Sequence, residues 1–161
     1  MRTAAAQRPE ADFLGIEISL KYARFAAAAL AKCGLTNAIV AVADASQLFA
    51  DLLPDDSLAA VHIYFPDPWW KQRHKKRRVM RESLVRHLER TLRCGARLHF
   101  WTDVEEYFRT SLELLAASTN LVGPVTVAEM PAAGDMDYCT HFERRMRLHH
   151  EPVYRAQFVK P

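Results

Sequence analysis

The most chemically suggestive residues form one short string in the middle of the chain. Phe65-Pro-Asp-Pro-Trp places a carboxylate between two prolines, and Trp70 follows directly. Because proline fixes its own backbone and restricts the residue before it, Asp67 is expected to be held rigidly. Trp69 and Trp70 supply flat faces on which a planar ring can stack. Residues 71–78 then hold six Lys and Arg and no acid. An oriented acid, a stacking surface and a cluster of cations are therefore contiguous.

This combination suits a nucleic acid ligand. A carboxylate beside a stacking surface can bind the donor edge of guanine, its N1–H and exocyclic amine, once the base is extruded. The cations suit phosphate groups. The expected phosphate contacts are Arg73, Lys75, Lys76, Arg77 and Arg78. The net charge is +3 for the whole chain but −3 without residues 71–78, which indicates one local anionic partner. By itself the basic run is more typical of a solvated surface, and a localisation signal is a weaker alternative.

The elements that position these residues alternate between strand and helix. Short apolar runs predict strands, and segments rich in helix formers predict helices, the first with Ser19 as its N-cap and Gly34 as its C-cap. The predicted strands are 12–18, 37–43, 58–65, 96–102, 122–130 and 153–159. The predicted helices are 20–33, 45–53, 79–92 and 103–118, and a loop holds 140–145. The pattern predicts a single α/β domain over residues 1–161, with a parallel sheet covered by helices on both faces.

Acidic residues stand at or just after four of the predicted strands. They are Glu17, Asp44, Asp67 and Asp103. In parallel sheets, ligands bind beyond the carboxyl ends of the strands. Glu17 is placed to accept hydrogen bonds from both ribose hydroxyls of an adenosine-containing ligand, and Asp44 from its exocyclic amine. Taken singly, each acid fits a helix N-cap or a solvated turn. Four acids at four strand ends favour a ligand site.

Features that the sequence lacks exclude or disfavour other classes of protein. No apolar run approaches the roughly 20 residues that cross a bilayer, and the first residues do not resemble a secretory signal. Cys33, Cys94 and Cys139 show no C-x-x-C spacing, and His149-His150 has no third ligand at suitable spacing. We therefore expect no metal site and a reducing cytoplasm. The glycines form neither a G-x-G-x-x-G nor a P-loop pattern.

Several of these motifs, in this order, resemble those of the bacterial tRNA (guanine-N7-)-methyltransferase family. The matching segments are 13–18 (FLGIEI), 44–45 (DA), 65–78, 102–103 (TD) and 140–145 (T-x-F-E-R-R). The resemblance implies a class I, Rossmann-like, mostly parallel sheet and S-adenosylmethionine as the cofactor. It also implies methyl transfer to N7 of guanine at position 46, in the variable loop of tRNA.

The resemblance also assigns roles to individual residues. Glu17, Asp44 and Asp67 match acids that hold the cofactor, and Asp67 lies beside the target guanine as the catalytic residue. The positions matched to substrate binding are Lys71, Asp103, Thr140, His141, Phe142 and Glu143. His74 to Arg78 match a basic stretch that contacts tRNA. Either Trp69 or Trp70 is expected to stack on the base.

The chemistry of guanine N7 bears on the expected role of Asp67. Guanine N7 carries a lone pair and no proton, so we expect Asp67 to orient guanine and cofactor more than to accept a proton.

The family has a first strand and a Gly-rich cofactor loop ahead of the segment that matches Phe13, and neither has a counterpart here. We therefore expect an incomplete chain in which the strands flanking that position each lack a partner, with weak folding or weak cofactor binding.

Two other functions remain open at the level of sequence. One is a non-catalytic RNA-binding remnant of such an enzyme, which the missing Gly-rich loop favours. The other is a Rossmann-like methyltransferase that acts on a protein or a small molecule, which the basic run disfavours. The retained Glu17, Asp44 and Asp67 favour the enzyme, because RNA binding alone needs none of them. We expect a monomer or a homodimer that binds tRNA.

Overall fold

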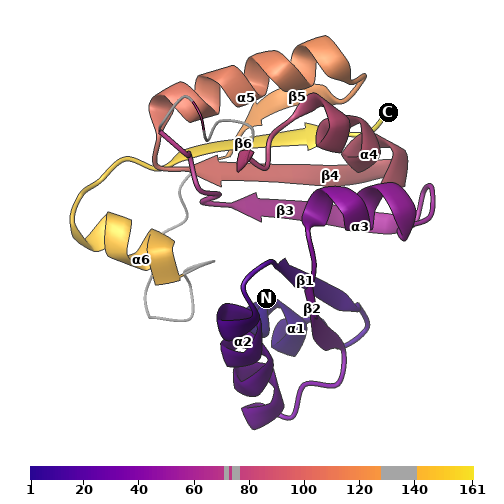
Figure 1. Cartoon of the computed structure of the whole chain (residues 1–161), viewed down its shortest axis with the longest axis vertical. Helices are drawn as coiled ribbons and strands as arrows, with labels where there is room; N and C mark the ends of the chain where they lie inside the picture. The colour runs from indigo at the N-terminus through magenta and orange to yellow at the C-terminus, as the bar shows by residue number, and fades with distance from the viewer. Residues whose placement is uncertain (71–72, 74–76, 128–140) are drawn as a thin grey trace. The chain divides into compact units, whose positions relative to one another are not determined.

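A computed structural model describes residues 1–70, 73, 77–127 and 141–161. Of the predicted site residues, Lys71, Lys75, Lys76 and Thr140 lie outside this part of the chain, as do His74 and the side chain of His141. The described chain divides into two compact units, residues 1–48 and 49–161, with the boundary inside helix α3 (Ala45–Asp51). Figure 1 shows the helices and strands of both units.

Residues 1–48 form a small layer of helices on two parallel strands. The elements are α1 (Arg2–Gln7), β1 (Phe13–Glu17), α2 (Leu20–Lys32) and β2 (Ala38–Val42). The strands pair in register from Phe13 opposite Ala38 to Glu17 opposite Val42. Buried Ala5, Leu30 and Ala38 form the centre of the core. The amide Nδ2 of Asn37 donates to the carbonyls of Ala5, Arg8 and Ala11 at 3.1, 3.1 and 2.8 Å, which ties the end of α1 to the start of β2.

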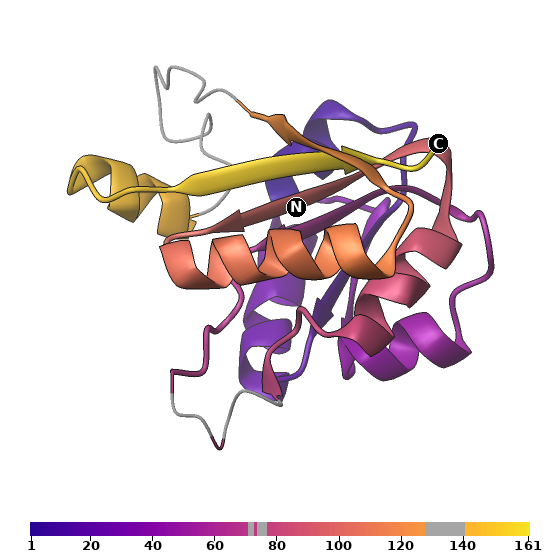
Figure 2. The same ribbon diagram turned by 90° about the horizontal axis from the view of Figure 1, so that it is seen from above.

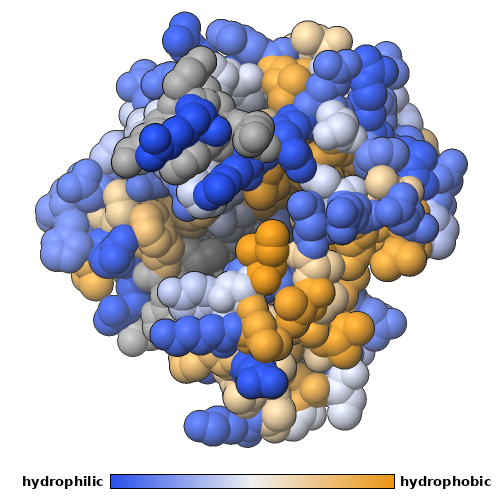
Figure 3. Space-filling view, in the orientation of Figure 1, coloured by the Kyte–Doolittle hydropathy of each residue, from blue (hydrophilic) through white to orange (hydrophobic). Residues whose placement is uncertain are grey.

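This first unit leaves much apolar surface in contact with solvent. Figure 3 shows apolar residues in orange among hydrophilic blue ones. The large exposed hydrophobic side chains of the unit are Met1, Leu14, Ile18, Leu20, Tyr22, Phe25, Ile39 and Val42. The buried core is made largely of alanine, so it removes little apolar area from water. Residues 1–48 therefore gain only modest stability from their own core.

Residues 49–161 contain a four-stranded sheet in the order β3-β4-β6-β5. Its strands are β3 (Leu58–Tyr64), β4 (Leu92–Thr102), β5 (Val122–Thr126) and β6 (Tyr154–Val159), and its helices are α4 (Glu82–Thr91), α5 (Glu105–Ser118) and α6 (His141–Leu148). β3 and β4 are parallel, whereas β6 is antiparallel to both β4 and β5. Figure 2 shows the β6 and β4 arrows pointing in opposite directions.

β3, β4 and β5 therefore run in one direction and β6 runs in the other, so the described sheet is mostly parallel, as the sequence predicts. The chain enters β6 at Tyr154, which pairs with Thr102 at the carboxyl end of β4, and then runs back along β4. Helices α4 and α5 contact each other and β4 (Figure 1). Their buried side chains, which include Leu84, Leu88 and Leu115, accompany Leu98, Phe100 and Phe158 of the sheet in the core. In the described part of the chain no helix is both long and apolar enough to cross a membrane.

Within the described residues, β1 is hydrogen-bonded to β2 alone and β3 to β4 alone. These are the strands that the resemblance predicts to flank an additional strand. Each therefore has one edge with no strand partner in the described part of the chain. Unpaired edges of this kind are sites at which another strand can add.

Most predicted boundaries agree with the structure to within two residues, and larger differences occur at α4, β4 and α6. The helix predicted from 79 begins at Glu82, because the backbone at Arg81 is extended (φ −136°) and the Met80 N–H donates to the Tyr107 hydroxyl. The strand predicted from 96 begins at Leu92. The predicted loop at 140–145 is helical from His141, where the Glu143–Arg147 pair supports the helix at i, i+4 spacing.

Arg90 joins α4 to the end of α3, and we expect its removal to lower the free energy of unfolding. Its Nη2 donates to the Phe49 carbonyl at 2.6 Å and its Nη1 to the Leu53 carbonyl at 3.1 Å, and the guanidinium also pairs with Asp55. Arg90→Ala leaves these carbonyls without a charged donor, so we expect the free energy of unfolding to fall by about 2–3 kcal/mol in urea titrations.

The matched control lies one turn earlier on the same helix. Arg86 pairs with Glu82 at 2.9 Å, and both side chains are 62% exposed. Arg86→Ala is expected to cost at most about 0.5 kcal/mol, because exposed pairs contribute little. Equal losses in the two variants would show that the carbonyl contacts of Arg90 do not stabilise this unit.

Candidate functional site

In residues 1–48 the two predicted acids lie at the carboxyl ends of neighbouring parallel strands, as the sequence predicts. Glu17 is the last residue of β1, and Asp44 follows β2 by two positions. The Glu17 Oε1 accepts the Ser19 backbone N–H at 2.8 Å, and the Asp44 Oδ1 accepts the Ser46 backbone N–H at 2.7 Å. Both residues are half-buried. Each carboxylate is therefore held in place by one oxygen as the chain turns into the next helix.

The same contact shows how the predicted N-cap of helix α2 is used. Ser19 occupies the N-cap position, as the sequence predicts. Its side chain makes no capping hydrogen bond, and its backbone N–H is the group that is used, as a donor to Glu17. Gly34, by contrast, has a φ of +64° just past the end of α2, which confirms its predicted place at the helix terminus.

In residues 49–161 the Phe65–Trp70 segment leaves the carboxyl end of β3 in an unusual backbone conformation. Phe65 still donates its N–H to the Trp101 carbonyl at 2.8 Å, which extends the β3–β4 ladder. Phe65 and Trp69 have φ values of +50° and +44°. For residues other than glycine this region costs roughly 1–3 kcal/mol each, and it persists where surrounding contacts enforce it. Such strain is typical of functional segments.

Asp67 and the two tryptophans lie on this strained segment. The Asp67 Oδ1 accepts the Trp69 backbone N–H at 3.0 Å, and the Asp67 side chain is exposed. Trp69 is half-buried, with the Arg77 guanidinium 5.1 Å from its ring centre, whereas Trp70 is 64% exposed. Arg73 and Arg77 are exposed. The arrangement presents a fixed carboxylate, an open indole face and two described cations from one segment.

Asp103 follows β4 directly, on the strand that neighbours β3. The turn here is made by Thr102, whose Oγ1 accepts the Val104 backbone N–H at 3.2 Å. Within the described residues the Asp103 carboxylate has no hydrogen-bond or ion-pair partner. Since β3 and β4 are parallel, the segments that carry Asp67 and Asp103 leave the same edge of the sheet, as predicted.

Helix α6 brings the predicted Phe142 and Glu143 to the same part of this unit. The Phe142 ring lies 4.7 Å from the Phe65 ring, between centroids, and the Arg145 guanidinium lies 4.6 Å from the Phe142 ring centre. The T-x-F-E segment therefore contacts the first residue of the Phe65–Trp70 segment, although the two are far apart in the sequence.

Glu143 itself is buried in an ion-pair cluster. Its Oε1 lies 3.2 Å from Arg155 Nη2 and 3.7 Å from Arg147 Nη1, and its side chain is only 5% exposed. Arg155 also lies over the Trp101 ring, 5.1 Å from its centre. Sequence analysis missed Arg155, because its place beside Trp101 depends on the antiparallel register of β6. The spacing of Glu143 and Arg147 on a helix was a readable signal.

Tyr107 of α5 is a second residue that sequence analysis missed. It is 1% exposed, its hydroxyl accepts the Met80 backbone N–H at 3.2 Å, and the Arg78 guanidinium lies 4.9 Å from its ring centre. Burial raises the pKa of the Tyr107 phenol above its ordinary value of 10.0, and the charge of Asp67 raises it further, although Met80 and Arg78 lower it. The phenol is therefore neutral at physiological pH.

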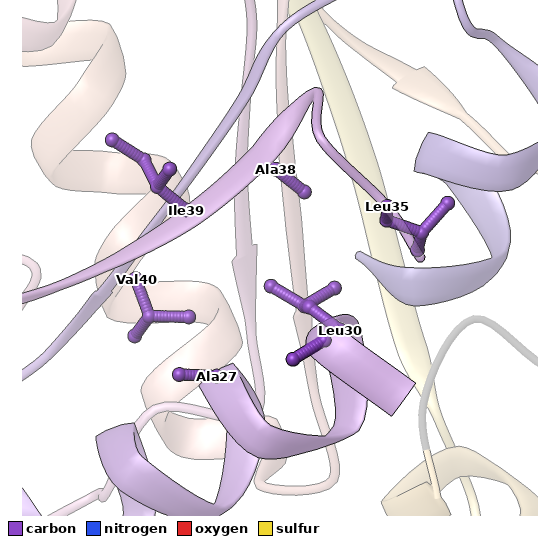
Figure 4. A pocket seen from close by; sticks show the side chains of 7 residues that line it. Ala27, Leu30, Leu35, Ala38, Ile39 and Val40 are labelled. Atoms are coloured by element: carbon purple, nitrogen blue, oxygen red, sulfur yellow. The ribbon is translucent and has the colours of Figure 1, made fainter. Parts of the chain in front are cut away.

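Two further features, possible metal ligands and an apolar cavity, add no chemistry to the site in the described part of the chain. Among the described residues, no three His, Cys, Asp or Glu side chains gather as metal ligands would. A cavity of about 320 Å³ lies between α2 and β2 (Figure 4), and it is lined by apolar residues alone. They are Ala27, Leu30, Ala31, Leu35, Ala38, Ile39 and Val40. None of the predicted site residues lines it.

Residues 1–156 match the family described as "Putative methyltransferase". The chain belongs to this methyltransferase family. The tRNA (guanine-N(7)-)-methyltransferase of Rhodopirellula baltica is 46% identical over 166 residues, which cover 99% of this chain and 61% of the relative. The enzyme of the same name from Burkholderia vietnamiensis is 40% identical, over 91% of this chain and 57% of the relative. The chain thus spans 57–61% of the length of these two curated relatives.

Solved methyltransferases share the fold of this family member. The precorrin-6y C5,15-methyltransferase of Geobacter metallireducens superposes with a TM-score of 0.63 at 19% identity, covering 98% of this chain and 72% of the other. A SAM-dependent O-methyltransferase of Thermotoga maritima gives a TM-score of 0.61 at 14% identity, covering 92% and 49%. At such low identity the likeness concerns the fold alone. It confirms the predicted class I methyltransferase fold.

The buried phenol of Tyr107 predicts a pH-dependent contribution to stability. Because its pKa is higher in the folded than in the unfolded chain, its contribution is complete below about pH 10 and is lost as pH rises through the folded pKa. We expect the free energy of unfolding of the wild-type chain, relative to Tyr107→Phe, to be constant from pH 8 to 9. Above about pH 10 it is expected to fall.

Urea unfolding at fixed pH values measures this difference. Tyr154 also has a raised pKa, for which burial and Glu105 are responsible, but both proteins contain it and its effect cancels in the comparison. A difference between wild type and Tyr107→Phe that stays constant up to pH 11 would contradict the assignment.

Proposed function

We propose that this chain takes part in the transfer of a methyl group from S-adenosylmethionine to N7 of guanine at position 46 of tRNA. The observation that carries the proposal is the Asp67 carboxylate, fixed by the Trp69 N–H at the end of β3 and next to an exposed indole. Two further facts support it. The chain is 46% identical, over 99% of its length, to a protein named for this reaction, and its cations are concentrated at 71–78. A tRNA-modifying role in the cytoplasm is part of the same proposal.

The residues of the first unit fit the adenosine part of the cofactor. Glu17 and Asp44 are acceptors at the carboxyl ends of adjacent parallel strands, and one oxygen of each is already fixed by a backbone N–H. Ribose hydroxyls and an exocyclic amine are donors, so the chemistry of the two groups matches. We assign Glu17 to the ribose and Asp44 to the adenine. When bound, the cofactor supplies a methyl group on a positively charged sulfur.

The residues of the second unit fit the target base. Asp67 accepts from the N1–H and exocyclic amine of guanine, which fixes the base in its plane, and it also contributes to cofactor binding. Trp69 or Trp70 stacks on the ring. Guanine N7 has no proton to lose, so the chain needs no general base, and catalysis consists mainly of orienting N7 in line with the methyl group.

The remaining contacts hold the tRNA. The predicted substrate-binding residues are Lys71, Asp103, Thr140, His141, Phe142 and Glu143. Among them, the buried Glu143 fixes the position of α6. The exposed Arg73 and Arg77, with Lys75 and Lys76, contact phosphates. Because α6 contacts Phe65 through Phe142, tRNA bound at α6 influences the segment that carries Asp67.

Calorimetric titration of S-adenosylmethionine into the purified chain, with tRNA present, tests the proposal. We expect saturable binding that Glu17→Gln weakens about tenfold, because a charged acceptor is replaced by a neutral one. Glu10→Gln, a change at an exposed acid outside the site, is the matched control and should bind normally. No cofactor binding while tRNA is still bound would favour the non-catalytic RNA-binding alternative. tRNA affinity that does not weaken with salt would favour a protein or small-molecule substrate.

A second prediction concerns Asp67 itself. Asp67→Ala and Asp67→Asn are expected to reduce methyl transfer below detection while tRNA affinity changes less than about threefold, because the carboxylate orients the base rather than binding phosphate. Single-turnover transfer of labelled methyl groups and filter binding measure the two quantities. Asp51→Ala, at an exposed acid of α3, is the control. Normal turnover of bound tRNA together with a large loss of affinity would contradict this role.

A further inference from the structure

Arg78 differs from the other described cations of the basic run. Arg73 and Arg77 are exposed, whereas Arg78 is half-buried. The Arg78 Nε donates to the Pro68 carbonyl at 2.6 Å, and its guanidinium lies 4.9 Å from the centre of the Tyr107 ring. One side chain thus binds the Phe65–Trp70 segment and the helix α5 at the same time.

The Tyr107 side chain that contacts Arg78 is itself fixed in the core. Its side chain is 1% exposed, and its ring meets Phe100 of β4 edge to face at 5.9 Å between centroids. Its hydroxyl accepts the Met80 N–H at 3.2 Å, so the chain just after Arg78 is attached to the same residue. Tyr107 therefore anchors the chain on the far side of the basic run to the core of the second unit.

The contact with Pro68 matters because of where Pro68 lies. It stands between Asp67 and Trp69, the two ends of the hydrogen bond that orients the carboxylate. Trp69 has a φ of +44°, a conformation that a residue with a side chain keeps only when its surroundings enforce it. A short, charge-assisted bond from Arg78 to the intervening carbonyl supplies such a constraint.

We propose that Arg78, stacked on Tyr107, is a positioning residue that holds the Asp67 turn in its active conformation, and that it does not contact a tRNA phosphate. The effect on methyl transfer rests on the proposed function, whereas the effect on the turn does not. Arginine suits this role because its Nε–H is directed and its plane stacks on an aromatic ring, and lysine offers neither property. To bind a phosphate, the same guanidinium would have to share or release the Pro68 carbonyl.

Hydrogen exchange of backbone amides tests, without any ligand, whether Arg78 holds the Asp67 turn. In Arg78→Lys and Arg78→Gln we expect the amides of Trp69 and Met80 to exchange about tenfold faster than in the wild-type chain, since both depend on the anchored conformation. Arg73→Gln removes the same charge from an exposed position of the same run and should leave both rates unchanged. Wild-type exchange rates in both Arg78 variants would overturn the proposal.

Steady-state methylation separates positioning from phosphate binding. We expect Arg78→Lys to lower kcat about tenfold and to leave the KM for tRNA and its salt dependence unchanged. If Arg78 instead contacts a phosphate, Arg78→Lys should keep kcat, because lysine can replace arginine as a point charge. Arg78→Gln should then lower the slope of log affinity against log salt by about one. Rescue of kcat by lysine would therefore overturn the proposal.

The two readouts also separate this proposal from the proposed function. If neither the wild-type chain nor any variant transfers a methyl group to tRNA, the proposed function fails. The exchange rates of Trp69 and Met80 then still decide whether Arg78 holds the turn. A melting temperature measured for every variant shows whether faster exchange is local, since global destabilisation would also accelerate the amides of the sheet.

Discussion

The parallel register of β3 with β4 is the constraint on which the site of the second unit depends. Tyr64 lies opposite Trp101, and the Phe65 N–H continues the ladder by one more bond. This register brings the segments that carry Asp67 and Asp103 out at the same edge of the sheet. A slip of one residue would turn every side chain of β3 to the other face, with Val61 and Ile63 leaving the core side. The burial of β4, in which Leu98 and Phe100 are fully inaccessible, resists such a slip.

The antiparallel strand β6 is the second element on which the site of the second unit depends. Its register places Arg155 opposite Trp101, and the guanidinium both stacks on that ring and pairs with Glu143. A buried carboxylate is costly unless it is well compensated, and here two arginines share one glutamate. The Glu143–Arg155 ion pair joins α6 to β6, and α6 also brings Phe142 to Phe65. Phe142 and Glu143 therefore connect β6 to the segment that carries Asp67.

The sequence predicts the strand-end acids well because their signal is local. An apolar run followed by an acid indicates the carboxyl end of a buried strand, and Glu17, Asp44 and Asp103 are all found there. Tyr107 and Arg155 could not be found in this way, because each acquires its role from residues distant in the chain. Tyr107 has the spacing of an ordinary core residue of an amphipathic helix, and only the fold shows that Met80 and Arg78 attach to it. Helix α6 escaped prediction because it is short and polar, with Phe142, Met146 and Leu148 as its apolar residues.

The carboxyl ends of β1, β2, β3 and β4 share one local hydrogen bond. In each case a side-chain oxygen accepts the backbone N–H two residues further on. The pairs are Glu17 with Ser19, Asp44 with Ser46, Asp67 with Trp69, and Thr102 with Val104, at 2.8, 2.7, 3.0 and 3.2 Å. Such turns satisfy a backbone donor that the strand has just released. In the first three, one carboxylate oxygen is fixed, and the other has no hydrogen-bond or ion-pair partner within the described residues.

At the end of β4 the same bond is made by a threonine, and the acid comes one residue later. Asp103 does not make this turn contact, and within the described residues neither of its carboxylate oxygens has a hydrogen-bond or ion-pair partner. This difference divides the acids into two kinds. Glu17, Asp44 and Asp67 are pre-oriented acceptors, which suits the fixed geometry that a cofactor and a target base require. Asp103 is free to adjust, which suits contact with the variable surface of a larger substrate.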